Sequence, residues 1–222
     1  MTERTELLIG IDGVKKLQNS HVAVFGVGGV GGYTAEMLVR AGVGELTIVD
    51  FDVVDITNLN RQIIALNSTI GKNKVDVMRE RLLDINPNLK INAINEKYTA
   101  DNRDKFFSTK YDYVVDAIDM VTSKVDLIKY CHANNIEIIS AMGAGNRYQV
   151  PEFKVVDIYK TYNDGLAKII RKKLREEGVQ KHLVAFTENE ATPNGDVIGS
   201  ISYYPAMCGC VIAGYVINQL IK

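Results

Sequence analysis

Apolar and polar residues follow two alternating spacings over the first two-thirds of the chain. Short runs that are almost continuously apolar predict strands buried on both faces, at 21–25, 46–49, 90–95, 111–115 and 137–141. Stretches with apolar residues three or four positions apart predict helices, at 31–41, 73–85 and 123–133. This alternation predicts an α/β fold with a Rossmann-like, mostly parallel sheet and helices on both of its faces.

The pattern changes after residue 145. Further strands are expected at 153–159 and 183–186, a basic helix at 167–177, a turn at 191–195 and an apolar helix at 206–221. We therefore expect one domain over 1–222, made of a Rossmann-like core at 1–145 and a C-terminal extension at 146–222 with additional strands and helices.

Composition changes this picture only by exclusion. The 222 residues contain 26 Lys and Arg against 27 Asp and Glu, a formal net charge of −1. This balance excludes a globally basic nucleic-acid-binding protein but leaves room for a local basic patch. We expect no signal peptide and no stable membrane span, because the last apolar segment is shorter than the roughly 20 residues that a span needs. Whether that final helix touches a membrane stays open.

The chain has three cysteines, Cys131, Cys208 and Cys210, and no C-x-x-C pair. An odd number without that spacing argues against a disulfide framework and against a structural zinc site, and favours the reducing cytoplasm. We expect all three to be packing residues. The three histidines have no metal-binding spacing.

A glycine-rich loop lies between the first predicted strand and helix. Gly26-Val-Gly28-Gly29-Val-Gly31 fits the pattern G-x-G-x-x-G, in which glycines let the backbone approach a phosphate at a helix N-terminus. Asp50 closes the next strand about 20 residues later, where a carboxylate can accept hydrogen bonds from ribose hydroxyls. The alternative is a tight turn without a ligand, but the strand–turn–helix context favours a nucleotide site.

Charged residues follow several of the predicted strands. In a parallel sheet these strand ends share one edge, which gathers Arg61, Lys72, Lys74, Asp50, Asp52, Asp116 and Asp119. A nicotinamide dinucleotide needs no such set, whereas a triphosphate uses cations for its phosphates and carboxylates for its metal ion. The edge therefore predicts ATP with Mg²⁺ rather than a dinucleotide.

Four motifs in order carry a family resemblance: G-x-G-G-x-G at 26–31, D-x-D-x-V-x-x-x-N-L-N-R-Q at 50–62, G-x-x-K at 71–74 and D-A-I-D at 116–119. They resemble the ubiquitin-activating-enzyme-like adenylyltransferases, well over residues 4–145. Within that superfamily the chain is most similar to the family of tRNA threonylcarbamoyladenosine dehydratases, through R-T-E-L-L-I-G at 4–10, M-G-A-G at 142–145 and A-K-x-x-R-K-x-L-R at 167–175.

The resemblance implies roles for particular residues. It implies that Asp50 holds the ATP ribose, that Arg61 and Lys74 contact the phosphates, and that Asp119 binds Mg²⁺. It also implies a homodimer in which Arg4 reaches the neighbouring subunit's site. The extension at 146–222 is expected to take part in substrate binding and dimer formation. The implied catalytic residues are Arg61, Lys74, Asp119 and Arg4. The implied ATP-binding set is Gly26, Gly28, Gly29, Gly31, Asp50, Asp52, Asn58, Arg61, Gln62, Lys74 and Asp119. Each of these residues has an alternative role. Arg61 and Lys74 could be surface charges, Asp119 could cap the following helix, and Arg4 could be part of a frayed terminus.

The implied reaction begins with adenylation of a carboxylate. In the dehydratase family that carboxylate belongs to threonylcarbamoyladenosine, next to the tRNA anticodon, and the acyl adenylate closes into a ring with loss of AMP. Ring closure is intramolecular, so no enzyme nucleophile is needed. Two alternatives remain: an adenylyltransferase for the C-terminus of a ubiquitin-like sulfur carrier, and a nucleotide-binding scaffold without chemistry. A sulfur-transfer partner protein also stays open.

Two features favour tRNA over a sulfur carrier. Sulfur-carrier-activating relatives commonly have C-x-x-C zinc pairs, which this sequence lacks. The predicted basic helix places Lys168, Arg171, Lys172 and Arg175 on one face, where they could neutralise backbone phosphates. Arg147 and Tyr148 are further candidates for contacts with the anticodon loop. A solvated helix face is the alternative for the basic stripe.

Overall fold

The structure is a computed structural model that describes residues 1–192 and 197–222. The strands are β1 His21–Phe25, β2 Glu45–Val49, β3 Lys90–Ile94, β4 Tyr113–Asp116, β5 Ile138–Ala141, β6 Phe153–Asp157 and β7 Leu183–Thr187. The helices are α1 Glu3–Gln18, α2 Gly31–Ala41, α3 Lys74–Ile85, α4 Arg103–Phe106, α5 Val121–Ala133, α6 Gly165–Glu176 and α7 Tyr203–Leu220. The expected turn at 191–195 lies partly outside the described residues.

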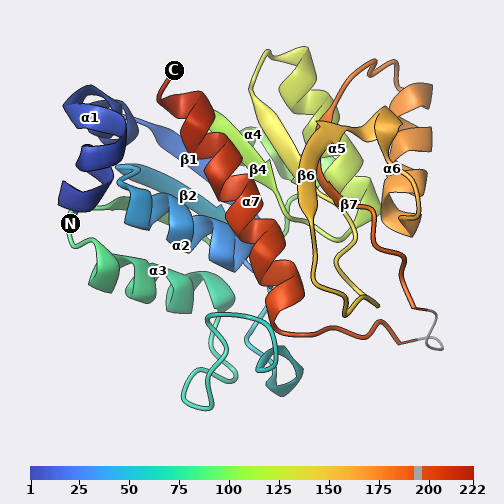
Figure 1. Cartoon of the computed structure of the whole chain (residues 1–222), viewed down its shortest axis with the longest axis horizontal. Helices are drawn as coiled ribbons and strands as arrows, with labels where there is room; N and C mark the ends of the chain where they lie inside the picture. The colour runs from blue at the N-terminus through green and yellow to red at the C-terminus, as the bar shows by residue number, and fades with distance from the viewer. Residues whose placement is uncertain (193–196) are drawn as a thin grey trace.

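The seven strands form one sheet in the order β3-β2-β1-β4-β5-β7-β6 (Figure 1). All neighbouring pairs are parallel except β6 with β7, which is antiparallel. The predicted mostly parallel α/β sheet is thereby confirmed. The extension supplies β6 and β7, and β7 pairs directly with β5, so the sheet is continuous across residue 145. The division at that residue into nucleotide-binding and substrate-binding parts stays a prediction.

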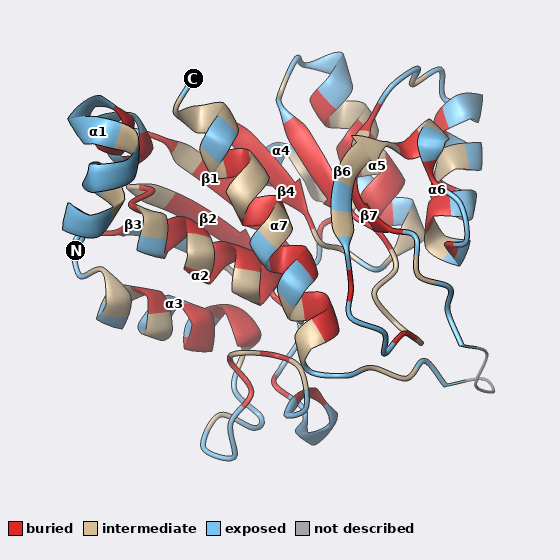
Figure 2. Ribbon diagram, viewed as in Figure 1, coloured by how far each residue is buried: buried red, intermediate tan, exposed pale blue. Residues whose placement is uncertain are grey.

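Helices cover both faces of the sheet, and its central strands are therefore buried on both sides (Figure 2). On one face, Leu38 of α2, Met78 of α3 and Ile212 of α7 pack against Val22 and Val24. On the other face, helices α5 and α6 pack against the side chains that alternate with these, such as Phe25 and Ala23. Helix α7 lies across α2 (Figure 1), so the end of the chain returns to the helix that follows the glycine-rich loop.

Helix α1 was not predicted from the sequence. Its apolar residues Leu7, Ile11, Val14 and Leu17 do have a helical spacing of 4, 3 and 3. The helix is kinked at Gly10, whose positive φ (φ 72°, ψ 170°) is non-helical and favours glycine. Val14 and Leu17 after the kink are buried, whereas Leu7 and Leu8 before it are 80% and 86% exposed. The kink therefore separates a packed turn from an exposed apolar one. Among the described residues, every helix is too short or too polar to span a membrane.

Candidate nucleotide site

A cavity of about 660 Å³ opens at the edge of the sheet where the parallel strands end. It contains nine of the residues assigned to ATP from the sequence: Gly26, Gly28, Gly29, Asp50, Asp52, Arg61, Gln62, Lys74 and Asp119. Such an edge is where ligands bind in open α/β sheets, because strand ends and helix N-termini converge there. The structure thus brings together residues that are up to about 90 positions apart in the sequence.

The glycine-rich loop forms the floor of this cavity. Gly26 has φ +89°, and a β-carbon there would lie 2.6 Å from the Ala117 carbonyl oxygen. A β-carbon at Gly31 would lie 1.8 Å from the Gly26 carbonyl oxygen, so Gly31 closes the turn and does not line the cavity. In the first turn of α2, the N–H groups of Gly32 and Thr34 already donate to the carbonyl oxygens of Gly28 and Val30, both at 3.0 Å. The helix N-terminus therefore offers an anion only the remaining N–H groups of that turn.

Asp50 is held in place by the backbone around it. One of its carboxylate oxygens accepts the N–H of Val27 at 2.7 Å, and the other accepts the N–H of Asp52 at 2.9 Å. Each carboxylate oxygen retains a further lone pair for a ligand hydroxyl. This geometry fits the predicted ribose contact.

Two cations face the cavity from different elements. The Lys74 ammonium, at the start of α3, donates to Asp52 at 2.7 Å, and its side chain is only 7% exposed. Arg61 donates to the Thr57 carbonyl oxygen and to Asn60, both on its own loop. Lys72, grouped with them from the sequence, is exposed and lies outside the cavity lining.

Asn58 is buried and does not line the cavity. It forms a capping box with Asp55 in the short helical turn Ile56–Asn58, and hydrogen bonds from Thr57 lower the pKa of Asp55. Gln62 does line the cavity, and its side-chain oxygen is buried with no hydrogen-bond partner. A buried acceptor without a partner is costly, so Gln62 offers a contact that a ligand would satisfy.

Asp119 lies exposed in the loop between β4 and α5. The described residues contain no group of three or more His, Cys, Asp or Glu side chains that could hold a metal ion alone. Mg²⁺ commonly binds through one or two carboxylates together with substrate phosphates, and Asp119 with Asp52, which lines the same cavity, fits that donor set. Asp116, grouped with them from the sequence, is instead fully buried and paired with Lys124.

Arg4 lies outside the lining of this cavity. Helix α1 ends beside the start of β1, at the amino ends of the strands, whereas the cavity opens at their carboxyl ends (Figure 1). A contact between Arg4 and nucleotide within one chain is therefore not supported, and the role of Arg4 in a neighbouring subunit's site stays a prediction.

Some cavity residues were missed by the sequence analysis. Lys97 and Tyr98 follow the weakly apolar strand β3, and the Lys97 ammonium lies 5.6 Å from the ring centroid of Phe51. The position of 96–98 after a strand end was the signal that could have revealed them. Ile198, Ser200 and Pro205 come from the extension and carry no motif.

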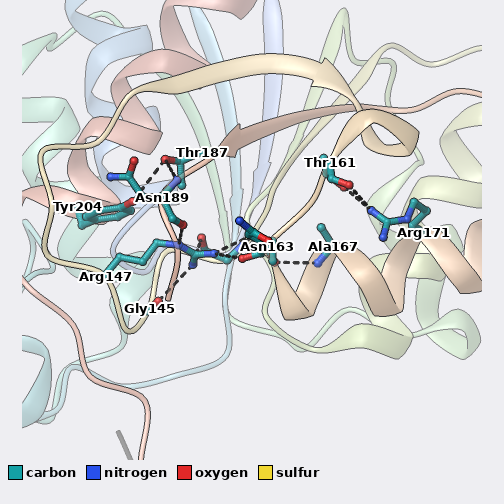
Figure 3. Close-up of polar contacts among 11 residues, drawn as sticks. Gly145, Arg147, Thr161, Asn163, Ala167, Arg171, Thr187, Asn189 and Tyr204 are labelled. Atoms are coloured by element: carbon teal, nitrogen blue, oxygen red, sulfur yellow. Dashed lines mark hydrogen bonds and ion pairs between the residues drawn. The ribbon is translucent and has the colours of Figure 1, made fainter. Parts of the chain in front are cut away.

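Arg147 is buried, contrary to its predicted role at the tRNA surface. The residue is 5% exposed, and its guanidinium donates to the carbonyl oxygens of Gly143, Gly145, Asn163 and Asn189 (Figure 3). These bonds hold together loops far apart in the sequence and occupy the donors that an RNA contact would need. Arg147 is thus a support for the loop, while Tyr148 beside it is 64% exposed.

The basic helix α6 begins beside the cavity. Asp164 caps it by accepting from Ala167 and also accepts the N–H of Gly143, the residue before the cavity-lining Ala144. Lys168, Lys172 and Arg175 are exposed along the helix. Arg171 is less available, because it donates to the carbonyl and hydroxyl oxygens of Thr161, both at 2.7 Å (Figure 3).

The cysteines are free thiols, and the predicted packing role holds for two of them. Cys131 and Cys208 are fully buried, and burial raises the pKa of the Cys208 thiol to about 12. Such a thiol is a poor nucleophile at neutral pH. Cys210 was expected to pack as well, but the helical turn of α7 places it at the surface, and it is exposed.

The structure joins two histidines that the sequence left separate. His182 is 1% exposed and hydrogen-bonds to His132 at 3.2 Å and to Ser140 at 2.8 Å. Burial, then the neighbouring His132, lowers the pKa of His182 well below its ordinary value of 6.5. The folded protein therefore keeps His182 neutral where the unfolded chain takes up a proton.

We expect acid to destabilise the fold through His182. As pH falls below 6.5 the unfolded state gains the proton first, so the free energy of unfolding falls by up to about 1.4 kcal/mol per pH unit until His182 itself is protonated. Urea unfolding at a series of pH values below 6.5 should show this fall in the free energy of unfolding. His182→Gln should flatten that slope, and an unchanged slope would assign it to other groups.

Sequence comparison gives the family. The ThiF family pattern matches residues 3–222. A tRNA threonylcarbamoyladenosine dehydratase of Bacillus subtilis is 41% identical over 99% of this chain and 94% of its own length. A tRNA threonylcarbamoyladenosine dehydratase of Escherichia coli is 40% identical over 80% of this chain and 67% of its own length.

Structural comparison agrees. The crystal structure of E. coli TcdA, a tRNA N6-threonylcarbamoyladenosine dehydratase, in complex with ATP superimposes with a TM-score of 0.95 and 34% identity, over 99% of this chain and 93% of that one. The match extends beyond the nucleotide-binding motifs to the whole extension. The family resemblance found in the sequence is therefore confirmed, and the chain belongs to the ThiF family.

Proposed function

We propose that this protein is an ATP-dependent enzyme that dehydrates threonylcarbamoyladenosine in tRNA through an acyl adenylate. The observation that carries the proposal is the single cavity that gathers the glycine-rich loop, Arg61, Lys74 and Asp119 in a chain similar along its whole length to the ATP-bound E. coli dehydratase. An orphaned acceptor on Gln62 and a carboxylate fixed at Asp50 support ATP as the ligand.

In the proposed reaction, a substrate carboxylate oxygen bonds to the α-phosphorus of ATP and the bond to pyrophosphate breaks. A nucleophile within the same substrate group then bonds to the activated carbonyl carbon, and AMP leaves. The sum is loss of one water from the nucleoside, with ATP converted to AMP and pyrophosphate.

The chain contributes position and charge to this reaction. Arg61 and Lys74 neutralise the phosphates, and Asp50 orients the ribose. Asp119 with Asp52 would hold Mg²⁺, which when bound would offset charge on the leaving pyrophosphate. Since no cysteine lines the cavity in the described part of the chain, a covalent thioester route has no support there.

We also propose that the active form is a homodimer in the cytoplasm. Exposed Leu7, Leu8 and Ile11 on α1 form an apolar surface that a second copy would cover. That interface would carry Arg4 toward the partner's cavity. Free thiols and a tRNA substrate support the compartment. A sulfur-transfer partner would have only Cys210 as an accessible thiol, because Cys131 and Cys208 are buried.

One assay tests the function. Purified protein is incubated with ATP, Mg²⁺ and tRNA that carries threonylcarbamoyladenosine, and the nucleoside is weighed by mass spectrometry. Loss of one water with equimolar AMP and pyrophosphate is expected, and sedimentation of the same preparation should give twice the mass of one chain. An unchanged nucleoside, with pyrophosphate released only when a ubiquitin-like sulfur carrier is added, would replace this function with the alternative one.

The basic helix gives a separate prediction for tRNA. Lys168→Glu with Lys172→Glu should raise the KM for tRNA at least about tenfold and reduce the salt slope of binding by about 2, since each cation neutralises one phosphate. The KM for ATP should not change. Lys90→Glu with Lys110→Glu alters net charge equally at exposed positions at the opposite edge of the sheet. Equal effects of the two pairs would point to net charge and not to a binding face.

A further inference from the structure

The ion pair between Asp116 and Lys124 is fully buried and lies outside the cavity lining. Asp116, the last residue of β4, accepts from the Lys124 ammonium of α5 at 2.7 Å, and both side chains are 0% exposed. Neither residue lines the cavity. The nucleotide contacts proposed above therefore do not account for this pair.

Lys124 connects three segments of the chain. Besides Asp116, its ammonium donates to the carbonyl oxygen of Ala141, the last residue of β5, at 3.1 Å. The other oxygen of Asp116 accepts the N–H of Ile118 at 3.1 Å. One buried cation thus fixes the end of β4, the first turns of α5 and the end of β5 relative to one another.

These segments lead directly into two walls of the cavity. The loop after Asp116 supplies Ala117, Ile118, Asp119 and Met120, and the loop after Ala141 supplies Ala144 and Gly145. The first loop also packs on the glycine-rich loop, since the Ala117 carbonyl oxygen occupies the space beside Gly26. A displacement of Lys124 would move Asp119 and the phosphate-binding loop together.

Stability alone gives a weak reason for such a pair. Removing two charges from water costs so much that apolar residues of similar volume often stabilise a fold equally or better. What an ion pair with three fixed hydrogen bonds supplies in addition is a defined geometry between segments.

We propose that Lys124 is a positioning residue of the adenylation site, which through Asp116 and Ala141 holds the Asp119 loop and the 142–145 loop in the arrangement that binds ATP with Mg²⁺. The inference rests on the proposed function for the identity of the nucleotide. It assigns no contact between Lys124 and the substrate.

The test separates positioning from stability. Lys124→Met alone leaves the Asp116 charge buried and unpaired, and we expect that variant to unfold. Asp116→Asn combined with Lys124→Met removes both charges. Asp116→Asn alone keeps an amide oxygen that can accept from Lys124 but leaves the buried ammonium without a counter-charge, so its Tm is measured beside that of the double variant. Lys124→Arg keeps the cation. Glu36→Gln breaks a buried ion pair between α2 and α3, with Arg40 and Arg81, outside the cavity lining.

The readouts are thermal unfolding and calorimetric titration of ATP at several MgCl₂ concentrations, with no tRNA present. The double variant should need at least fivefold more Mg²⁺ for half-maximal ATP binding, and Asp116→Asn at least threefold more. Lys124→Arg should stay within twofold of the unaltered protein. Glu36→Gln should lower the Tm without changing the Mg²⁺ dependence. With tRNA, the double variant should lose at least tenfold in kcat, with the KM for tRNA within twofold.

Wild-type Mg²⁺ dependence of ATP binding in either the double variant or Asp116→Asn would overturn the proposal, as would an equal shift in Glu36→Gln. Failure of the unaltered protein to bind ATP would overturn it as well. If the unaltered protein binds ATP with Mg²⁺ but leaves tRNA unchanged, the proposed dehydration fails while the binding titrations still decide the role of Lys124.

Discussion

Arg61→Ala is expected to lower kcat/KM for modified tRNA at least about a thousandfold while the protein stays folded. The proposed transition state spreads negative charge over the α-phosphate and the leaving pyrophosphate. Arg61 lines the cavity from the loop between β2 and α3, and its hydrogen bonds go to Thr57 and Asn60 of the same loop. A charge-assisted donor can therefore turn toward phosphate without breaking contacts with the core.

The same geometry explains why stability should be spared. Arg61 is half-buried in an irregular segment. After the substitution, water can donate to the two oxygen atoms that now accept hydrogen bonds from Arg61. Arg79→Ala at an exposed position of α3 is the matched control, since it removes the same charge outside the cavity lining. Steady-state kinetics and thermal unfolding measure both effects. Equal kinetics for the two variants would remove Arg61 from the site.

The parts of the fold and the site that could be predicted share a short-range origin. Buried strands have continuous apolar runs, and residues that directly follow parallel strands reach one edge whatever the loops do. Asp50, Asp52 and Asp119 were therefore predictable from position alone, and the cavity contains all three. Lys74 was predictable from its place at the start of a helix, α3, which follows the loop after β2.

The parts that could not be predicted depend on contacts between distant segments. The sequence places Arg147 at the surface, because no local pattern shows that it also donates to carbonyl oxygens 16 and 42 residues away, at Asn163 and Asn189. Asp116 was grouped with Asp119, although the lysine one helical turn into α5 neutralises the first and leaves the second exposed. Burial of a charge is decided by its partner, and the sequence does not say which cation points inward.

The glycine-rich loop should divide into two roles when its members are replaced singly. Gly31→Ala is expected to cost at least about 4 kcal/mol or to abolish folding, because the new β-carbon would lie 1.8 Å from the Gly26 carbonyl oxygen, a backbone atom that cannot turn away. Gly28→Ala should fold almost normally. Its dihedral angles lie outside the left-handed region, and the nearest atom to its β-carbon is the side-chain nitrogen of Gln62 at 3.7 Å.

For Gly28→Ala the loss should appear in ligand binding. A methyl group on the cavity floor would occupy the space in which the backbone approaches a phosphate, so we expect the Kd for ATP to rise at least about tenfold while the Tm stays within a few degrees. Calorimetric titration and thermal unfolding of both variants check this. Unaltered ATP affinity in a folded Gly28→Ala protein would mean that the phosphates do not lie on this loop. A stable Gly31→Ala protein would mean that the start of α2 can shift, and would weaken the case that the loop is rigid before nucleotide binds.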